Sequence, residues 1–186
     1  MPNTQTDEEL AALVQKKDEA AFALIMERYT GKLLRYGNRL LPKENNVGDI
    51  VQDVFVTVYQ NIQDFDSTRK FSPWIYRIAH NAFIDTVRKK NREPIYLFDF
   101  DKVIPHPVYE DPLIREKEDE ETRVLLKKGL EGLSSSYREV IDLYYFENFS
   151  YKEISDILHI PVGTVGIRLS RARDALKKNL PKQNYE

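Results

Sequence analysis

Residues 150–178, SYKEISDILHIPVGTVGIRLSRARDALKK, carry the clearest local signals in this sequence and decide the fold of its C-terminal part. The segment opens with a capping box, in which the Ser150 side chain accepts from the free N–H groups of the first turn and Glu153 reaches back to the Ser150 amide. The apolar side chains that follow lie on one helical face, at Ile154, Ile157 and Leu158. We therefore predict a helix that starts after Ser150 and ends before residue 159.

A turn and a second helix follow the first. Residues 159–163 interrupt the periodicity, since Pro161 cannot continue a helix and Gly163 can adopt unusual backbone angles. The second helix has an apolar stripe of Val165, Leu169, Ala172 and Leu176. Its opposite face carries Thr164, Ile167, Arg168 and Arg171. Residues 164–178 hold five basic residues against one acid, so this helix is predicted to present a basic outer face.

Two short helices joined by a tight turn, the second of them basic, are typical of a helix-turn-helix that places its second helix in a DNA major groove. The alternative is a plain helical hairpin whose arginines are solvated. The capping box, the turn residues and the placement of charge agree with one another, so we favour DNA binding.

The charge of the chain is small in total but unevenly distributed. Its 186 residues are enough for one domain or two small ones, and the net charge is −2. Residues 65–92 hold seven basic residues against two acids, whereas residues 108–121 hold seven acids against two basic residues. We therefore expect two positive surfaces joined by an acidic connector.

The composition also excludes several classes of protein. There is no cysteine, which excludes disulfides and thiolate metal sites. The N-terminus, MPNTQTDEEL, is polar and acidic, unlike a signal peptide, and no stretch approaches the length of about 18 apolar residues that suggests a membrane helix. We expect a soluble, cytoplasmic protein.

The N-terminal half is predicted to form amphipathic helices after a disordered start at residues 1–7. The clearest of them spans residues 49–62, where apolar residues recur every four positions at Ile50, Val54, Val58 and Ile62. The other face of this helix carries Asp49, Gln52, Asp53, Val56 and Gln60. From the pattern alone, that face is best interpreted as ordinary solvated surface.

A further helix start is marked by Ser72 as the cap and Pro73 at the first helical position. This helix is predicted to continue to about residue 90, with a polar stripe of Arg77, Asn81, Asp85 and Arg88. The loop before it interleaves aromatic and basic side chains, which are Phe65, Arg69, Lys70 and Phe71. Together with Trp74 these groups suit unstacked bases and phosphates, although one aromatic ring taken alone is more often part of a core.

Residues 94–122 contain several prolines and many acids and are predicted to form a linker, extended at first and helical from Leu113. The linker would join an N-terminal domain, residues 1–93, to a C-terminal domain, residues 123–186. In the second domain a helical pair that starts near Val124 leads into the helix-turn-helix. The predicted fold class is therefore all-α, with two small helical domains and an acidic, proline-containing linker.

Four motifs in this order resemble those of a bacterial extracytoplasmic-function (ECF) sigma factor of the sigma-70 family. They are GDIVQDVF (residues 48–55), FDSTRKFSPWIYRIAHNAFID (65–85), LSSSYREVIDLYYFENFSYKEISDIL (133–158) and IPVGTV with RLSRARDALK (160–177). The resemblance extends from about residue 8 to residue 181. It implies a protein that binds core RNA polymerase, recognises a two-part promoter and starts DNA melting by trapping single-stranded bases.

The resemblance also assigns roles to matching residues. Core polymerase, through the clamp of its large subunits, would contact Asp49, Gln52, Asp53, Val56 and Gln60, and its flap region is a further expected partner. Melted minus-ten DNA would contact Phe65, Arg69, Lys70, Phe71, Trp74, Arg77, Asn81, Asp85 and Arg88. Duplex minus-thirty-five DNA would contact Thr164, Gly166, Ile167, Arg168, Ser170, Arg171 and Arg173. The acidic linker would pass through polymerase near the path of the nascent RNA.

Three positions depart from the family's habit. Gly48 stands where the docking motif usually has an acid, and Gly166 and Ile167 stand where the recognition helix commonly has a basic residue and a small polar one. A glycine inside a helix costs about 1 kcal/mol relative to alanine, so Gly166 suggests a close approach of the backbone to DNA. Ile167 suits a thymine methyl group. The minus-thirty-five preference therefore does not follow from the family.

The resemblance further implies an anti-sigma factor, often membrane-anchored, that covers the surfaces for polymerase and DNA. The runner-up function is a free-standing helix-turn-helix transcriptional regulator, although the N-terminal half shows no ligand or phosphorylation constellation. An enzyme is disfavoured, because His80 and Asp85 lie about 140° apart around one helix and Asp99 and Asp101 lie in the predicted linker. We expect no catalytic residue, cofactor, metal or small-molecule substrate.

Overall fold

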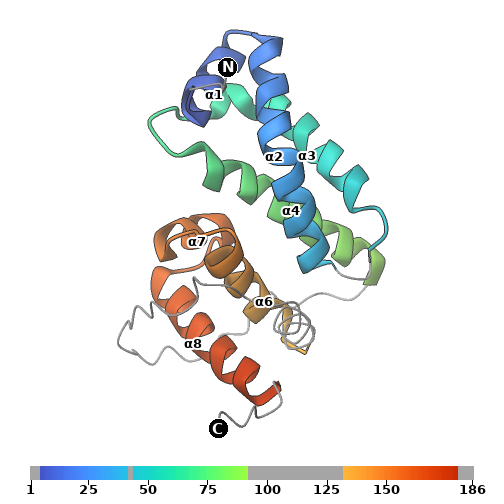
Figure 1. Cartoon of the computed structure of the whole chain (residues 1–186), viewed down its shortest axis with the longest axis vertical. Helices are drawn as coiled ribbons and strands as arrows, with labels where there is room; N and C mark the ends of the chain where they lie inside the picture. Colours follow the sequence, from blue (N-terminus) through green and yellow to red (C-terminus); the bar gives the residue numbers. More distant parts are fainter. Residues whose placement is uncertain (1–4, 42–43, 92–131, 180–186) are drawn as a thin grey trace, which may run out of the picture. The chain divides into compact units, whose positions relative to one another are not determined.

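The computed structural model describes residues 5–41, 44–91 and 132–179, and within these ranges every regular element is a helix (Figure 1). The all-α fold class predicted from the sequence is thereby confirmed. The chain divides into an N-terminal and a C-terminal unit, each of which is considered by itself below. The predicted linker and the start of the predicted helical pair at Val124 lie outside the described residues.

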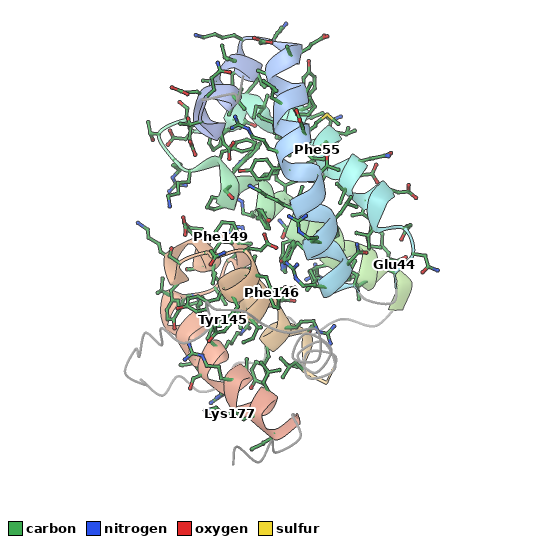
Figure 2. All side chains as sticks on the ribbon, viewed as in Figure 1. Glu44, Phe55, Tyr145, Phe146, Phe149 and Lys177 are labelled. Atoms are coloured by element: carbon green, nitrogen blue, oxygen red, sulfur yellow. The ribbon has the colours of Figure 1, made fainter. Side chains whose placement is uncertain are left out.

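The N-terminal unit consists of α1 (Asp7–Gln15), α2 (Glu19–Leu40), α3 (Val47–Asn61), the short 3-10 helix η1 (Ile62–Asp64) and α4 (Phe71–Asn91). Figure 1 shows α2 running along this unit with α3 and α4 beside it, and both of these helices contact α2. Phe55 of α3, labelled in Figure 2, is buried and meets Phe22 of α2 edge to face, with 6.5 Å between the ring centroids.

The start of the chain is more ordered than its sequence predicts. Helix α1 begins at Asp7 behind a capping box, in which the Glu9 N–H donates to Thr6 Oγ1 at 3.1 Å and the Thr6 N–H donates to Glu9 Oε2 at 2.8 Å. The predicted disorder of residues 1–7 is therefore wrong for Thr6 and Asp7. Residues 16–18 separate α1 from α2, because Lys17 has a left-handed φ of 68° and the Asp18 side chain caps α2.

Helix α4 begins at Phe71, two residues earlier than predicted. The assignment of Ser72 as the cap and Pro73 as the first helical residue is wrong, since both lie inside the first turn. The N–H of Phe71 donates instead to Oε1 of Glu8 on α1, at 2.9 Å. The capping role predicted for Ser72 at the start of α4 is thus taken by Glu8 of α1.

The core of this unit is closely packed where α2 passes α3 and α4. A Cβ atom added to Gly37 of α2 would lie 2.6 Å from Val47 Cγ1 and 2.7 Å from Phe83 Cζ. Such distances are too short for any side chain without movement of its neighbours, so the helices approach here only because position 37 is glycine. The apolar stripe of α3 faces inward as predicted, with Ile50, Val54 and Val58 buried.

The C-terminal unit consists of α6 (Ser135–Ile141), one π-helical turn η2 (Asp142–Phe146), α7 (Tyr151–Leu158) and α8 (Val162–Asn179). The predicted capping box is confirmed, since the Glu153 N–H donates to Ser150 Oγ at 3.3 Å and the Ser150 N–H donates to Glu153 Oε2 at 2.8 Å. The turn between α7 and α8 differs from the prediction. His159, with a φ of 53°, takes the left-handed conformation, whereas Gly163 lies in the first turn of α8 without a positive φ.

Helix α8 packs on α6 through its predicted apolar stripe. Val165, Leu169 and Ala172 are buried, and Leu176 is half-buried. Because a helix turns by about 100° per residue, Ile167, Ser170 and Arg171 lie on the side away from this stripe. The packing of α8 therefore fixes which of its polar side chains point outward.

Candidate nucleic-acid interface

The outward face of α8 carries most of the residues expected to read the minus-thirty-five element. Thr164, Ile167 and Arg171 are half-buried, and Ser170 is exposed. A hydroxyl, an aliphatic and a guanidinium group thus lie within about two helical turns. These are groups that contact base edges, thymine methyls and phosphates in a major groove.

Arg168 lies on the same helix but also acts on a buried acid. Glu139 of α6 is 6% exposed, and this burial raises the pKa of its carboxyl to about 7. The positive charges of Arg168 and Arg138 act in the opposite direction, because they favour the ionised carboxylate. The sequence predicts only a DNA contact for Arg168 and does not identify Glu139, because no local spacing relates residues on two helices.

Arg173 and Gly166 have neighbours within the C-terminal unit. The guanidinium carbon of Arg173 lies 6.0 Å from the ring centroid of Tyr145, at the edge of the range for a cation–π attraction. Tyr145 belongs to η2 and is labelled in Figure 2. A Cβ atom added to Gly166 would meet Tyr151 Cε2 at 3.6 Å, an ordinary contact. The packing inside the unit therefore does not require glycine at position 166.

The aromatic residues next to the 66–70 loop form one cluster with a single half-exposed member. Phe65 is 5% exposed and Phe71 is fully buried, whereas Trp74 is half-buried. The ring centroid of Trp74 lies 5.1 Å from that of Phe65 and 5.5 Å from that of Phe71. The two buried phenylalanine rings thus pack against the indole. Trp74 is the ring of this cluster that is accessible for stacking with a base.

The loop itself, residues 66–70, is exposed and is shaped by Asp66. Oδ1 of Asp66 accepts from the Thr68 hydroxyl at 2.7 Å and from the Thr68 N–H at 3.0 Å. Both hydrogen bonds lower the pKa of the Asp66 carboxyl below its ordinary value, and the bond from the Thr68 hydroxyl has the larger effect. This turn leaves Arg69 and Lys70 on the surface, where they can approach phosphates.

The predicted polar stripe of α4 is present on the surface next to Trp74. Asn81 and Asp85 are exposed, and Arg77 and Arg88 are half-buried. Arg88 donates to Asp85 Oδ1 at 3.2 Å, so these two charges are already paired within the helix. The helical spacing places all four on the same side as Trp74, so the cluster and the stripe form one continuous surface. Below we call residues 66–70, Trp74 and this stripe the α4 surface.

The outer face of α3 contains every residue predicted to dock on polymerase. Asp49, Gln52, Asp53, Val56 and Gln60 are all exposed. Val56 is 54% exposed, and the face also contains Tyr59, which is 45% exposed and was missed. The Tyr59 ring packs on Phe22 of α2, with centroids 5.0 Å apart. The sequence held a signal for Tyr59, because it lies seven residues after Gln52 and outside the buried stripe.

The structure does not bring together His80 and Asp85, the candidate pair that lies within the described residues. His80 is buried, and its Nδ1 forms a hydrogen bond of 2.8 Å with the Tyr36 hydroxyl, whereas Asp85 is exposed. In the described ranges no group of three His, Cys, Asp or Glu side chains could hold a metal ion. Among the helices of these same ranges, none has the length and apolar character needed to cross a membrane.

Two family models match separate parts of the chain. The model for Sigma-70 region 2 matches residues 25–93, and the model for Sigma-70 region 4 matches residues 123–176. The ECF RNA polymerase sigma factor SigW of Bacillus subtilis is 37% identical over 178 residues, which cover 90% of this chain and 92% of that protein. The ECF RNA polymerase sigma-E factor of Escherichia coli is 32% identical over 183 residues, with 95% of both chains covered.

Two solved structures are similar to this chain over most of its length. CnrH in complex with the cytosolic domain of CnrY aligns with a TM-score of 0.67 and 26% identity, covering 94% of this chain and 96% of that one. The sigma factor RpoE of Bartonella quintana, solved in complex with the anti-sigma factor NepR, aligns with a TM-score of 0.65 and 27% identity, covering 85% of this chain and 95% of that one.

Proposed function

Because this chain belongs to the sigma-70 family as an ECF sigma factor, we propose that it binds core RNA polymerase and directs promoter-specific transcription initiation through three defined surfaces. The observation that carries the function is the match to SigW over 90% of the chain, together with the matches to both sigma regions. We assign residues 1–93 to a region 2 domain, residues 94–122 to a linker and residues 123–186 to a region 4 domain.

The outer face of α3 is the proposed docking surface for the clamp of polymerase. Its polar members surround two exposed apolar side chains, Val56 and Tyr59. An interface of this kind, with a small apolar centre and a polar rim, is typical of specific protein association. The flap region of polymerase is a second proposed contact, made by the C-terminal unit.

The α4 surface is the proposed site for the melted minus-ten strand. Trp74 offers a half-exposed indole supported by two buried rings. Stacking of a base on an aromatic side chain is worth about 1–3 kcal/mol, which offsets part of the cost of unstacking that base from the duplex. Arg69, Lys70 and Arg77 would neutralise phosphates on either side, and Asn81 could form hydrogen bonds with a base edge.

The outward face of α8 is the proposed reader of the minus-thirty-five duplex. Arg171 lies on the face opposite the buried stripe, as the recognition helix of a helix-turn-helix requires. Thr164, Ile167 and Ser170 lie near it on the same outward face. We therefore assign Arg171 to the contact with the duplex, on the ground of its place on this face.

An anti-sigma factor is the proposed regulator of this protein. RpoE of Bartonella quintana is solved with such a partner, the anti-sigma factor NepR. A partner that covered the α3 face or the α8 face would block polymerase or promoter binding directly. We propose that the protein acts in the cytoplasm, where polymerase is found, and that its partner is either soluble or anchored in the membrane.

The experiment that tests this function is run-off transcription with purified core polymerase and a library of promoter fragments, combined with co-purification of the factor and core. New start sites that need both the factor and core are expected, and the enriched sequences would define the two promoter elements. Binding to duplex DNA without association with core would instead support the free-standing regulator.

Two sets of variants assign the surfaces. Replacing Gln52 and Asp53 with lysines should abolish association with core, whereas Glu27→Lys, a change at an exposed acid on α2, should not. Arg171→Ala should weaken promoter binding and leave core binding intact, whereas Lys177→Ala, near the C-terminal end of α8 (Figure 2), should have a smaller effect. Equal loss of core and promoter binding in Arg171→Ala would contradict the division of labour between the surfaces.

A further inference from the structure

Helix α1 holds the backbone of the exposed 66–70 loop at both of its ends. From these contacts we propose that Glu8 and Gln15 are positioning residues, which set the shape of this loop for capture of the melted minus-ten strand. The proposal rests on the proposed function of the α4 surface. It concerns a segment outside both family models, because the region 2 model begins at residue 25 and α1 lies before it.

The end of the loop that enters α4 is held by Glu8. Oε1 of Glu8 accepts from the N–H of Phe71, the first residue of α4, at 2.9 Å in a partly buried position. The first N–H groups of a helix have no partner within the helix, and a negative charge is favourable beside them. Glu8 therefore fixes where the loop stops and α4 begins.

The other end of the loop is held by Gln15, the last residue of α1. Its Nε2 donates to the carbonyl oxygens of Ile62 at 2.8 Å and of Phe65 at 2.7 Å. In return, Gln63 Nε2 donates to the Gln15 carbonyl oxygen at 2.9 Å. A primary amide is suited to this position, because it can donate to two carbonyl groups at once.

Helix α1 is itself anchored to the rest of the unit. Asp7 accepts from the Arg28 guanidinium at 2.7 Å and from the Tyr29 hydroxyl at 2.6 Å. Burial, followed by the hydrogen bond to Asp7, raises the pKa of Tyr29 above its ordinary value, so the hydroxyl remains a donor. The Tyr29 ring also meets the Phe71 ring, with centroids 5.6 Å apart. Glu8 and Gln15 therefore extend from a helix whose position is fixed by its contacts with α2 and α4.

Between the contacts made by Gln15 and Glu8, the loop is exposed and shaped by the turn at Asp66 described above. A loop that is held in its bound shape loses less conformational freedom on binding, so part of the ordering cost is removed in advance. Loss of the hydrogen bonds of Glu8 or of Gln15 should therefore weaken binding of the single strand, although the groups that contact the strand are unchanged.

The test uses full-length protein with core polymerase and the variants Glu8→Ala and Gln15→Ala. Glu8→Gln is the rescue variant, because its amide oxygen can still accept from Phe71. Asp18→Ala is the stability control, because it removes the cap of α2 without touching the loop. The probe is the non-template-strand oligonucleotide of the promoter with the strongest factor-dependent start site.

Two measurements separate positioning from general destabilisation. Amide exchange of Phe71, followed by NMR, should accelerate in Glu8→Ala, and remain slow in Glu8→Gln and Asp18→Ala. Affinity of the holoenzyme for the oligonucleotide should fall by about fivefold to tenfold in Glu8→Ala, which loses one hydrogen bond, and by at least as much in Gln15→Ala, which loses two. Affinity for minus-thirty-five duplex and for core should not change.

A further variant, Arg69→Ala with Lys70→Ala, distinguishes failure of this inference from failure of the proposed function. If that variant loses affinity for the oligonucleotide and the α1 variants do not, the positioning role is wrong and the α4 surface stands. If the loop variant keeps full affinity, the proposed minus-ten surface is wrong and the positioning role is lost with it. A loss in Asp18→Ala equal to that in the α1 variants would also overturn the positioning role.

Discussion

Replacing Glu139 with glutamine is expected to change how the stability of the C-terminal unit depends on pH. In the folded protein, burial raises the pKa of the Glu139 carboxyl from 4.5 to about 7, against the attraction of Arg168 and Arg138. Between these two pH values the unfolded chain has lost the proton and the folded chain still holds it. The folded state binds more protons, so the free energy of unfolding must fall as the pH rises.

The size of this effect follows from the pKa difference. Each pKa unit corresponds to about 1.4 kcal/mol, so the full fall between pH 4.5 and pH 7 is about 3 kcal/mol, of which roughly 2 to 3 kcal/mol lies between pH 5 and pH 8. Glu139→Gln has no proton to lose and should not show this fall. The pH dependence is the quantity to compare, because the burial cost of the amide is the same at both pH values.

Hydrogen exchange measured by mass spectrometry on peptides from α6 and α8 at pH 5 and pH 8, corrected for intrinsic rates, reports the opening free energy of this unit. The single tryptophan, Trp74, lies in the N-terminal unit and would not report it. The control is Asp156→Asn, which removes an exposed carboxyl from α7. A carbon-13 titration of the Glu139 carboxyl with its midpoint below about pH 5, or the same pH dependence in wild type and Glu139→Gln, would refute the reasoning.

Three further substitutions test packing and the DNA surfaces. Gly37→Ala should lower the free energy of unfolding by about 1–3 kcal/mol, because the added methyl group would overlap Val47 and Phe83; a thermal melt followed by Trp74 fluorescence measures it, and an unchanged melting temperature would contradict the close approach. Gly166→Ala should stabilise α8 by up to about 1 kcal/mol, because its new methyl group finds ordinary contact with α7. If the backbone approaches DNA there, this variant should nevertheless bind minus-thirty-five duplex more weakly, and unchanged binding would remove that explanation for the glycine. Trp74→Ala should slow promoter melting by about fivefold or more, since a stacking surface worth about 1–3 kcal/mol is lost. Permanganate footprinting measures the rate, and a melt of the free protein shows whether the unit still folds.

The sequence alone was sufficient wherever the signal lies within one helix. The capping box of Ser150 and Glu153 acts across one helical turn, and the stripe of Val165, Leu169 and Ala172 follows from the helical period. Both predictions are confirmed. A second capping box, at Thr6 and Glu9, satisfied the same rule and was overlooked, which led to the predicted disorder at the start of α1.

Prediction from local sequence was wrong where more than one backbone conformation suits the same residues. Pro161 and Gly163 both indicate a turn, yet the left-handed residue is His159, because the chain must reverse directly after the last residue of α7. Similarly, Ser72 followed by Pro73 is a good helix start, but the Glu8 side chain is available to cap a helix that begins two residues earlier. The choice in the second case depends on a residue far away in the sequence.

What the sequence by itself determined is the all-α class, the helix-turn-helix and the family, because these depend on spacings within short segments and on motifs in a fixed order. Only the tertiary structure decided that Phe65 and Phe71 lie beneath Trp74, that Arg168 acts on Glu139, and that Glu8 and Gln15 hold a loop more than forty residues away. Burial and contacts between helices arise from how several amphipathic faces pack together. No period or spacing along a single helix encodes them.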